Sequence, residues 1–267
     1  MVVEITGLRI AIGEREIVHG VDLTIDDGER VGLIGSSGSG KSMIARAMLG
    51  LLPMQAIVGG SIRLDGTEVV GASDRALADL RGRYSGMVFQ NPAVSLNPVL
   101  TVGRQIALPL RLHYDLTRAE REERVAMMLD KVGLSADVSA KYPHELSGGQ
   151  QQRVGIATAL VTSPRLIIAD EPTTALDSIT QRQIVGLLTS LVDDAGASML
   201  FITHDFSVLA SATTRCAVLD VGRIVETGTT ADLLTHPGTD CTARLVTAAR
   251  ALALQPNAGE GFGKDYA

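Results

Sequence analysis

Residues Gly35 to Ser42 have the composition and spacing of a phosphate-binding loop. They read GSSGSGKS, fit the pattern G-x-x-x-x-G-K-[ST], and follow an apolar run that begins at Val31. Glycines allow the backbone to turn without Cβ clashes, so successive N–H groups can point at one anion. The strand expected before the loop and the helix expected after it argue against a chance glycine-serine loop. The residues expected to hold the phosphates are Gly35, Ser36, Ser37, Gly38, Ser39, Gly40, Lys41 and Ser42.

Four side chains could supply the chemistry at such a phosphate site. Lys41 offers a mobile charge for the β- and γ-phosphates, and Ser42 offers a hydroxyl for Mg²⁺. Asp170 ends the apolar run Leu166–Ala169 and can bind Mg²⁺ directly or through water. Glu171 is one residue further and can polarise an attacking water. A strand that ends in Asp-Glu is otherwise an ordinary turn, but the phosphate loop upstream favours the catalytic interpretation.

Two more polar side chains follow buried strands. His204 comes directly after the apolar run Ser198–Thr203 and could reach the γ-phosphate or hold Glu171 and water in place. Gln90 follows the run Ser85–Phe89 and is a candidate ligand of metal and water. A lone His or Gln at a strand end is more often structural, so each signal is weak by itself.

A second anion site is expected at Ser147, Gly148 and Gly149. These residues, followed by Gln150, place a hydroxyl and unhindered backbone N–H groups at the start of a helix. The site could serve a different phosphate, or the same phosphate approached from another subunit. The spacing alone does not decide between them, and a plain serine-capped helix is the structural alternative.

The elements that must position these residues alternate between strand and helix, which predicts an α/β fold with a mainly parallel central sheet. Helical, amphipathic character is expected from Asn91 to about Glu145, where the charge run Arg118–Arg124 is interpreted as a solvated face. The pairs Gly59-Gly60 and Asp65-Gly66 are expected to flank a short strand in a hairpin. Asp205 is expected to cap a helix. Predicted strands cover 2–9, 21–25, 61–64, 85–89, 166–169, 198–203, 215–220 and 223–227. Predicted helices cover 41–52, 74–80, 117–132, 178–192 and 239–252, and a further helix opens with 146–150 and runs to about 160.

Composition sets the remaining limits. The chain has 267 residues, is 45% hydrophobic and carries a net charge of −6, which suits one large α/β domain and argues against a nucleic-acid partner. No apolar run approaches the roughly eighteen residues of a membrane span, and the first residues lack the layout of a signal peptide. Cys216 and Cys241 are isolated and are interpreted as reduced, packed side chains.

Together these residues resemble the ATP-binding cassette (ABC) ATPases over about 2–237. The matching motifs occur in family order: GSSGSGKS, Gln90, LSGGQ at Leu146–Gln150, LIIADEP, ALD at Ala175–Asp177, and His204. The resemblance implies ATP and Mg²⁺ as ligands and a head-to-tail pair of cassettes. Each ATP would lie between one phosphate loop and the partner's LSGGQ, so Ser147, Gly148, Gly149 and Gln150 would act in trans and Asp177 would communicate across the interface.

The likeness is narrower still to the dipeptide, oligopeptide and nickel importer ATPases, on QNPAVSLNPVLTVGRQI, KYPHELSGGQQQRVGIATAL and the later HPGTDCTARLV. It implies an ATPase at the cytoplasmic face of the cell membrane, attached peripherally. The expected partners are a second, more often different, ATPase subunit, two permeases and, indirectly, an extracytoplasmic solute-binding protein. The family usually stacks an aromatic residue on adenine, whereas Ile12 is the nearest equivalent here and offers only apolar contact.

This resemblance predicts a cassette over 1–237 with a helical subdomain inserted at about 91–145. Residues 238–267 are expected to form a short helix and a flexible tail. Two alternatives stay open: a non-transport ABC ATPase of the translation or DNA-repair type, and an unrelated phosphate-loop kinase. One cassette and no heptads disfavour the first, and LSGGQ disfavours the second.

Overall fold

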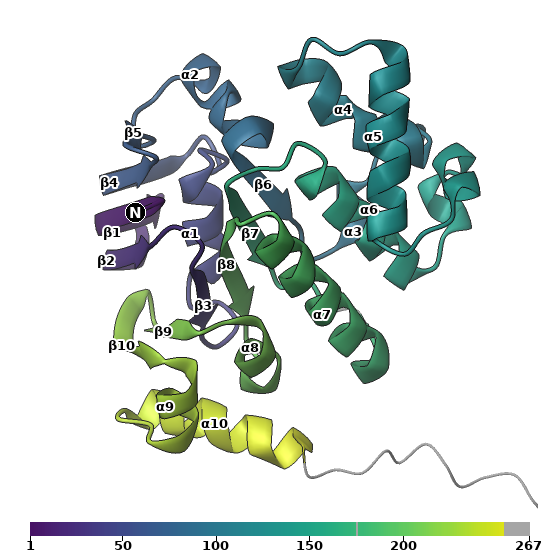
Figure 1. Ribbon diagram of the computed structural model, residues 1–267. Helices are drawn as coiled ribbons and strands as arrows, with labels where there is room; N and C mark the ends of the chain where they lie inside the picture. Colours follow the sequence, from purple (N-terminus) through teal and green to yellow (C-terminus); the bar gives the residue numbers. More distant parts are fainter. Residues whose placement is uncertain (175, 254–267) are drawn as a thin grey trace, which may run out of the picture.

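The computed structural model describes residues 1–174 and 176–253, which form two sheets and the helices that pack against them (Figure 1). The first sheet has four antiparallel strands in the order β2-β1-β4-β5, and the second has six strands in the order β10-β9-β3-β8-β7-β6. The strand bounds are β1 Val3–Ile12, β2 Arg15–Ile25, β3 Arg30–Ile34, β4 Ala56–Leu64, β5 Thr67–Glu68, β6 Ser85–Val88, β7 Leu166–Asp170, β8 Ser198–Thr203, β9 Arg215–Asp220 and β10 Arg223–Thr229.

The central sheet is parallel apart from one edge. Strands β9, β3, β8, β7 and β6 run in the same direction, and β10 returns antiparallel to β9. Every residue of β7 and β8 is buried, as expected for strands covered on both faces. Because the strands are parallel, the residues that follow β3, β6, β7 and β8 meet at one edge of the sheet. The predicted α/β fold is confirmed.

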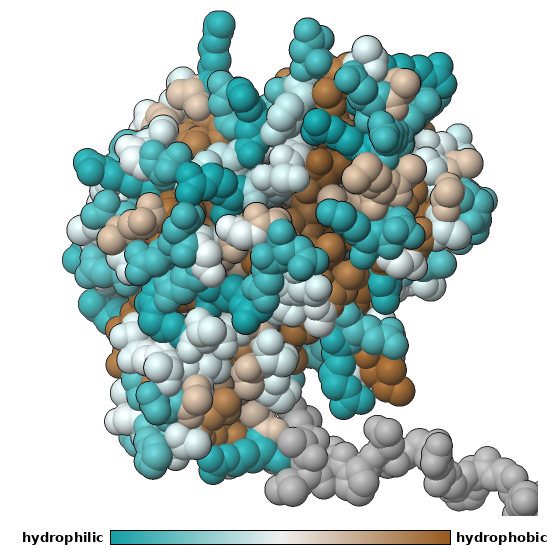
Figure 2. Space-filling view, in the orientation of Figure 1, coloured by the Kyte–Doolittle hydropathy of each residue, from teal (hydrophilic) through white to brown (hydrophobic). Residues whose placement is uncertain are grey.

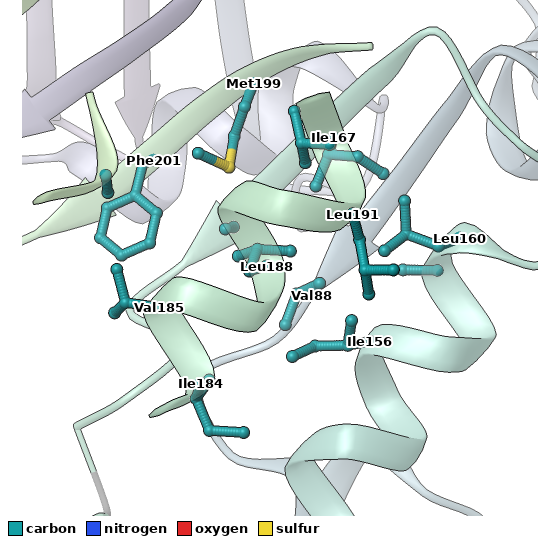
Figure 3. Close-up of a cluster of buried hydrophobic side chains, with 14 of the residues drawn as sticks. Val88, Ile156, Leu160, Ile167, Ile184, Val185, Leu188, Leu191, Met199 and Phe201 are labelled. Atoms are coloured by element: carbon teal, nitrogen blue, oxygen red, sulfur yellow. The ribbon is translucent and has the colours of Figure 1, made fainter. Parts of the chain in front are cut away.

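Helices cover both faces of this sheet. Their bounds are α1 Lys41–Met48, α2 Asp74–Ala78, α3 Pro92–Ser95, α4 Val102–His113, α5 Arg118–Lys131, α6 Gly148–Leu160, α7 Ser178–Asp194, α8 Phe206–Ala212, α9 Thr230–Thr235 and α10 Asp240–Ala253, with shorter turns η1 Leu80–Tyr84, η2 Ala136–Ala140 and η3 Pro143–Glu145. On one face, α6 and α7 pack on the sheet through Ile156, Leu188, Ile167 and Phe201 (Figure 3). On the other face, α1 and the antiparallel sheet share a core that includes Leu33 and Ile44.

The segment between β6 and α6 contains α3, α4, α5, η2 and η3, and no strand is assigned to it. This agrees with the helical character expected from Asn91 to Glu145. Thr117 caps α5 with a full capping box, in which its side chain accepts from the Glu120 N–H and Glu120 accepts from the Thr117 N–H. Within the described ranges, no helix combines the length and apolar character needed to cross a bilayer.

Two expectations about elements need correction or limitation. Gly59 and Gly60 lie inside β4, which starts at Ala56, and do not precede a shorter strand. Gly60 has φ +88°, and a Cβ there would lie 2.5 Å from the carbonyl oxygen of Gly7, opposite a bulge in β1. The predicted C-terminal helix is present as α10, whereas the predicted flexible tail at 254–267, like Ala175 of the ALD motif, lies outside the described residues.

Candidate active site

The phosphate loop connects the end of β3 to the start of α1. Gly38 and Gly40 have φ of +80° and +108°, in the region where a side chain is strained. Gly35 has ordinary φ, but a Cβ there would lie 2.1 Å from the backbone oxygen of Leu219, so the position has no room for one. The loop then enters α1, where Met43 and Ile44 donate to the carbonyl of Gly40. The sequence therefore builds a cradle of backbone N–H groups at a helix N-terminus, which suits a phosphate.

Lys41 lies inside this cradle with a side chain that is 4% exposed. Its Nζ donates to the carbonyl oxygens of Gly35 at 2.8 Å and Ser36 at 3.0 Å. Burial lowers the pKa of Lys41, and the charges of Glu171 and Asp170 oppose that shift. The ammonium is thus held by the loop backbone, 4.0 Å from Oε1 of Glu171.

Ser42 and Asp170 face each other beside the loop. The Ser42 Oγ donates to Oδ1 of Asp170 at 2.9 Å. Burial raises the pKa of Asp170, against the effect of this hydrogen bond. In the described part of the chain, no three His, Cys, Asp or Glu side chains gather around one point as a metal cluster. A hydroxyl and a carboxylate fit Mg²⁺, which takes oxygen ligands and is bound through few protein groups plus phosphates and water.

Glu171 is the point at which the predicted site residues meet. Its Oε2 accepts from Gln90 Nε2 at 2.9 Å and from Thr174 Oγ1 at 2.8 Å. Its Oε1 lies 3.3 Å from His204 Nδ1. The Glu171 side chain is 11% exposed, and its backbone has φ +46°, which is uncommon for a residue other than glycine. Strain of this kind is typical of functional sites.

A hollow of about 470 Å³ opens beside these groups. It is lined by Ser37, Gly38, Gly40, Lys41, Ser42, Gln90 and Glu171 of the predicted set, and by Arg15, Ile17 and Met43. Ile12, the residue expected beside adenine, is absent from this lining. Arg15 and Ile17, at the start of β2, line the hollow, so the structure adds a guanidinium that the sequence did not indicate. Arg15 and Thr174 were both missed, since neither belongs to a recognisable motif.

The predicted second anion site lies elsewhere on the molecule. Ser147 caps α6 with a capping box, in which its Oγ accepts from the Gln150 N–H at 3.3 Å. Asp177 caps α7, accepting from the N–H groups of Ile179 and Thr180, which lowers the pKa of Asp177. Both helix ends border a hollow of about 430 Å³ lined by Ser147, Gly148, Gly149, Gln150, Arg153, Leu176, Asp177, Thr180 and Gln183.

The two hollows are separate features of one chain. Neither includes a residue that lines the other. The phosphate loop therefore shares a hollow with Gln90 and Glu171, while Asp170 contacts Ser42 and His204 contacts Glu171. Ser147 and Asp177 line the other hollow.

Comparisons with known proteins agree with this architecture. The ABC transporter family model matches residues 18–174. A Brucella ovis protein named for peptide import and ATP binding is 43% identical over 249 residues, which cover 88% of this chain and 74% of that protein. The oligopeptide transport ATP-binding protein OppD of Mycobacterium tuberculosis is 46% identical over 219 residues, and the match covers 81% of this chain but only 36% of OppD.

Solved structures agree as well. A dimeric, post-hydrolysis structure of the ATP-binding cassette MJ0796, bound to ADP and Pi, superposes with a TM-score of 0.76 at 33% identity and covers 85% of this chain and 98% of that one. The order of the motifs, their convergence on Glu171 and these matches lead to one assignment. This chain belongs to the ABC transporter family of ATP-binding proteins.

Proposed function

We propose that this chain is the ATP-hydrolysing subunit of an importer that takes up peptides or a related small solute. The observation that carries the proposal is the group around Glu171. A carboxylate held by Gln90, Thr174 and His204 lies beside a phosphate loop, which is the arrangement needed to position and polarise a water next to a γ-phosphate.

The chain's own groups divide the work of hydrolysis. The loop N–H groups and Lys41 bind the phosphates, and Ser42 and Asp170 would hold Mg²⁺, which neutralises charge on the phosphate oxygens. Glu171 accepts a hydrogen bond from the attacking water, while Gln90 and His204 keep its carboxylate in place. The base would extend along Arg15 and Ile17, which line the same hollow as the phosphate loop.

A second cassette completes the site in this proposal. Ser147, Gly148 and Gly149 would contact the phosphates of an ATP held by the partner, and Asp177 would contact the facing subunit. Two observations support this: the hollows are separate within one chain, and the similar cassette MJ0796 is described as a dimer. The partner would be a second copy or, as in many importers of this type, a related but different subunit.

Permeases would dock on the helical subdomain and the Gln90 loop, at the cytoplasmic face of the membrane. Phe89, Val94 and Val99 are 44%, 81% and 75% exposed just around and after Gln90. Exposed apolar side chains close together mark interaction surfaces. Figure 2 shows that hydrophobic surface is exposed near the middle of one face of the molecule and is flanked by hydrophilic residues. An extracytoplasmic binding protein would deliver the solute to the permeases.

Peptide is the favoured cargo over nickel, because the relatives are named for peptide and oligopeptide transport. The same names weigh against a translation or DNA-repair ATPase. The test is to co-express the chain with the permeases of its operon and to measure peptide uptake into vesicles. Uptake should require ATP and should stop with Glu171→Gln, while assembly persists. Failure to co-purify with any permease would contradict the importer role.

A further inference from the structure

A hollow of about 590 Å³ lies in the helical subdomain, between α4, α5 and η2. It shares no lining residue with the two hollows described above. Arg104, Ala107 and Arg111 line it from α4, at intervals of three and four residues that place them on one side of that helix. Arg118, Arg121 and the residues that follow line it from α5. The hollow is thus a groove along a hairpin of two helices.

The groove concentrates positive charge on an acidic protein. Among the lining residues, Arg104, Arg111, Arg118 and Arg121 stand against one carboxylate, that of Glu122. The lining therefore has a formal excess of three positive charges, in a chain whose net charge is −6. The sequence alone indicated a solvated charged face for Arg118–Arg124. In the structure, two arginines of that run converge with two arginines of α4, and such convergence attracts anions.

Much of this charge is not neutralised within the described residues. The Nε of Arg118 binds Oε1 of Glu122 at 2.7 Å, which uses the one carboxylate of the groove. Arg121 donates to the backbone oxygen of Leu116, a neutral acceptor, and its charge is partly offset by the nearby carboxylate of Glu120, which caps α5. Among residues 1–174 and 176–253, neither Arg104 nor Arg111 has a carboxylate oxygen within 4.0 Å. Arg111 and Arg118 lie on either side of the short α4–α5 loop, which also contains Asp115.

The floor of the groove is apolar. Val125 and Leu129 are buried there, and Ala107 and Ala126 leave room because their side chains are small. Thr101 and Ser139 add hydroxyls at the other end. A volume of about 590 Å³ falls in the range of small-molecule sites, which is roughly 300–1,000 Å³. The groove therefore offers guanidinium groups for an anionic group and apolar surface for an organic part.

We propose that this groove binds an organic phosphate, with the phosphate near Arg111, Arg118 and Arg121. A phosphate monoester carries about −1.5 to −2 charges at neutral pH and can accept paired hydrogen bonds from several guanidinium groups at once. A carboxylate carries one charge and would leave most of the excess uncompensated. The phosphate could belong to a soluble metabolite or to a phosphatidic acid headgroup, and the two sources share this chemistry.

The experiment measures binding by calorimetry on the full chain carrying Glu171→Gln, with saturating ATP and Mg²⁺ to occupy the phosphate loop. The probes are glucose 6-phosphate, with glucose as its neutral control, and vesicles of phosphatidylcholine with or without phosphatidic acid. The matched variants are Arg111→Gln in the groove and Arg75→Gln on α2, which remove the same charge from exposed helical positions.

Glucose 6-phosphate should bind saturably while glucose does not, and Arg111→Gln should weaken binding about five- to tenfold while Arg75→Gln leaves it unchanged. Binding only to phosphatidic acid vesicles, with the same dependence on Arg111, assigns the lipid as the source. Absence of saturable binding by either phosphate probe, or equal weakening by both variants, would overturn the proposal. Binding of hexaglutamate with no binding of either phosphate probe would overturn it as well and indicate an acidic peptide.

Discussion

Glu171 has the most interactions of any residue in the candidate site, and its substitution tests the proposed chemistry directly. Glu171→Gln keeps the size of the side chain and one acceptor oxygen, but it replaces the other oxygen with an NH2 donor and removes the base. We expect ATP binding to persist and turnover to fall by about 10²–10⁴-fold. The measurements are nucleotide affinity and phosphate release, with Glu123→Gln on the exposed side of α5 as the control. Near-normal turnover in Glu171→Gln would refute the assigned role.

Arg15 is the second residue whose substitution tests the candidate site. The sequence pointed to Ile12 beside the base, whereas the structure places Arg15 and Ile17 along the hollow. A guanidinium can lie flat on a purine, an interaction of roughly 0.5–1 kcal/mol at exposed sites. Arg15→Ala should therefore weaken ATP binding about two- to fivefold and leave tripolyphosphate binding unchanged. If Arg15→Ala weakened the binding of ATP and of tripolyphosphate equally, Arg15 would act only through its charge on the phosphates.

Motif spacing was enough to predict which residues gather around the phosphate loop, but it did not indicate Arg15 or Thr174. The positions of Lys41, Asp170 and Glu171 follow from parallel strands that end at one edge, so the order of motifs determines them. Arg15 depends on how β2 begins after the turn at Gly13, which no periodicity encodes. Thr174 contacts Glu171 through a local turn that only coordinates reveal.

At the scale of elements, two glycines should respond in opposite ways to alanine. A Cβ on Gly86 of β6 would lie 2.2 Å from the backbone oxygen of Ala159 on α6, so the strand and helix must move apart. We expect Gly86→Ala to cost about 1–3 kcal/mol of unfolding free energy. A Cβ on Gly186 of α7 would meet no atom within 4 Å, and Gly186→Ala should add about 0.5–1 kcal/mol. Urea unfolding measures both, and equal effects would contradict this packing.

The attachment of α10 depends on Glu226 and should depend on pH. Its carboxylate accepts from the N–H groups of Gly238 and Thr239 and from the hydroxyls of Thr239 and Thr242, at the N-terminus of α10. Burial, the largest single influence, raises the pKa of Glu226, but these hydrogen bonds together lower it below its usual 4.5. The stabilisation is therefore complete above about pH 4.5 and is lost as pH falls through the lowered pKa.

Glu226→Gln should accordingly lower the unfolding free energy by about 1–2 kcal/mol at neutral pH, and the difference from the unsubstituted chain should shrink in acid. Amide hydrogen exchange should detect this loss of stability in α10 before it detects a loss in the other elements. Glu4→Gln on the exposed side of β1 is the control. A difference that grows as pH falls would contradict the assignment.

The elements were predicted well where burial is strong and less well where glycines occur within strands. The predicted strand Ser198–Thr203 matches the bounds of β8, because a mainly apolar run of six residues is long enough for a buried strand and too short for a typical helix. Gly59-Gly60 was assigned to a turn, yet Gly60 lies in β4 opposite the β1 bulge at Gly7. Glycine is favoured both in turns and at positions where two backbones approach closely, and a single sequence does not distinguish these two cases.

At the scale of the whole molecule, the separation of the two hollows has a consequence for assembly. The phosphate loop and Ser147 belong to different hollows of one chain, so a single copy holds half of each proposed site. Sequence spacing left open whether Ser147 serves a different phosphate or the same one from another subunit. Among the described residues that line this hollow, Asp177 is the one acidic side chain, and it caps α7. No carboxylate there is free to act as a base as Glu171 would, which fits the proposal that Ser147 serves an ATP held by another subunit.

Mixing two defective copies tests this assembly. Lys41→Ala removes the positive charge that would bind the phosphates. Ser147→Arg blocks the helix end that would meet the partner's ATP. Each variant alone should be inactive. An equimolar mixture should recover activity, because the mixed dimer pairs the intact loop of the Ser147→Arg copy with the intact Ser147 of the Lys41→Ala copy. If this chain works only with a different subunit, the same rescue should appear when Lys41→Ala is placed in one subunit and Ser147→Arg in the other. No recovery in either arrangement, or activity of the unsubstituted chain that is independent of its concentration, would mean that each copy hydrolyses ATP without the other.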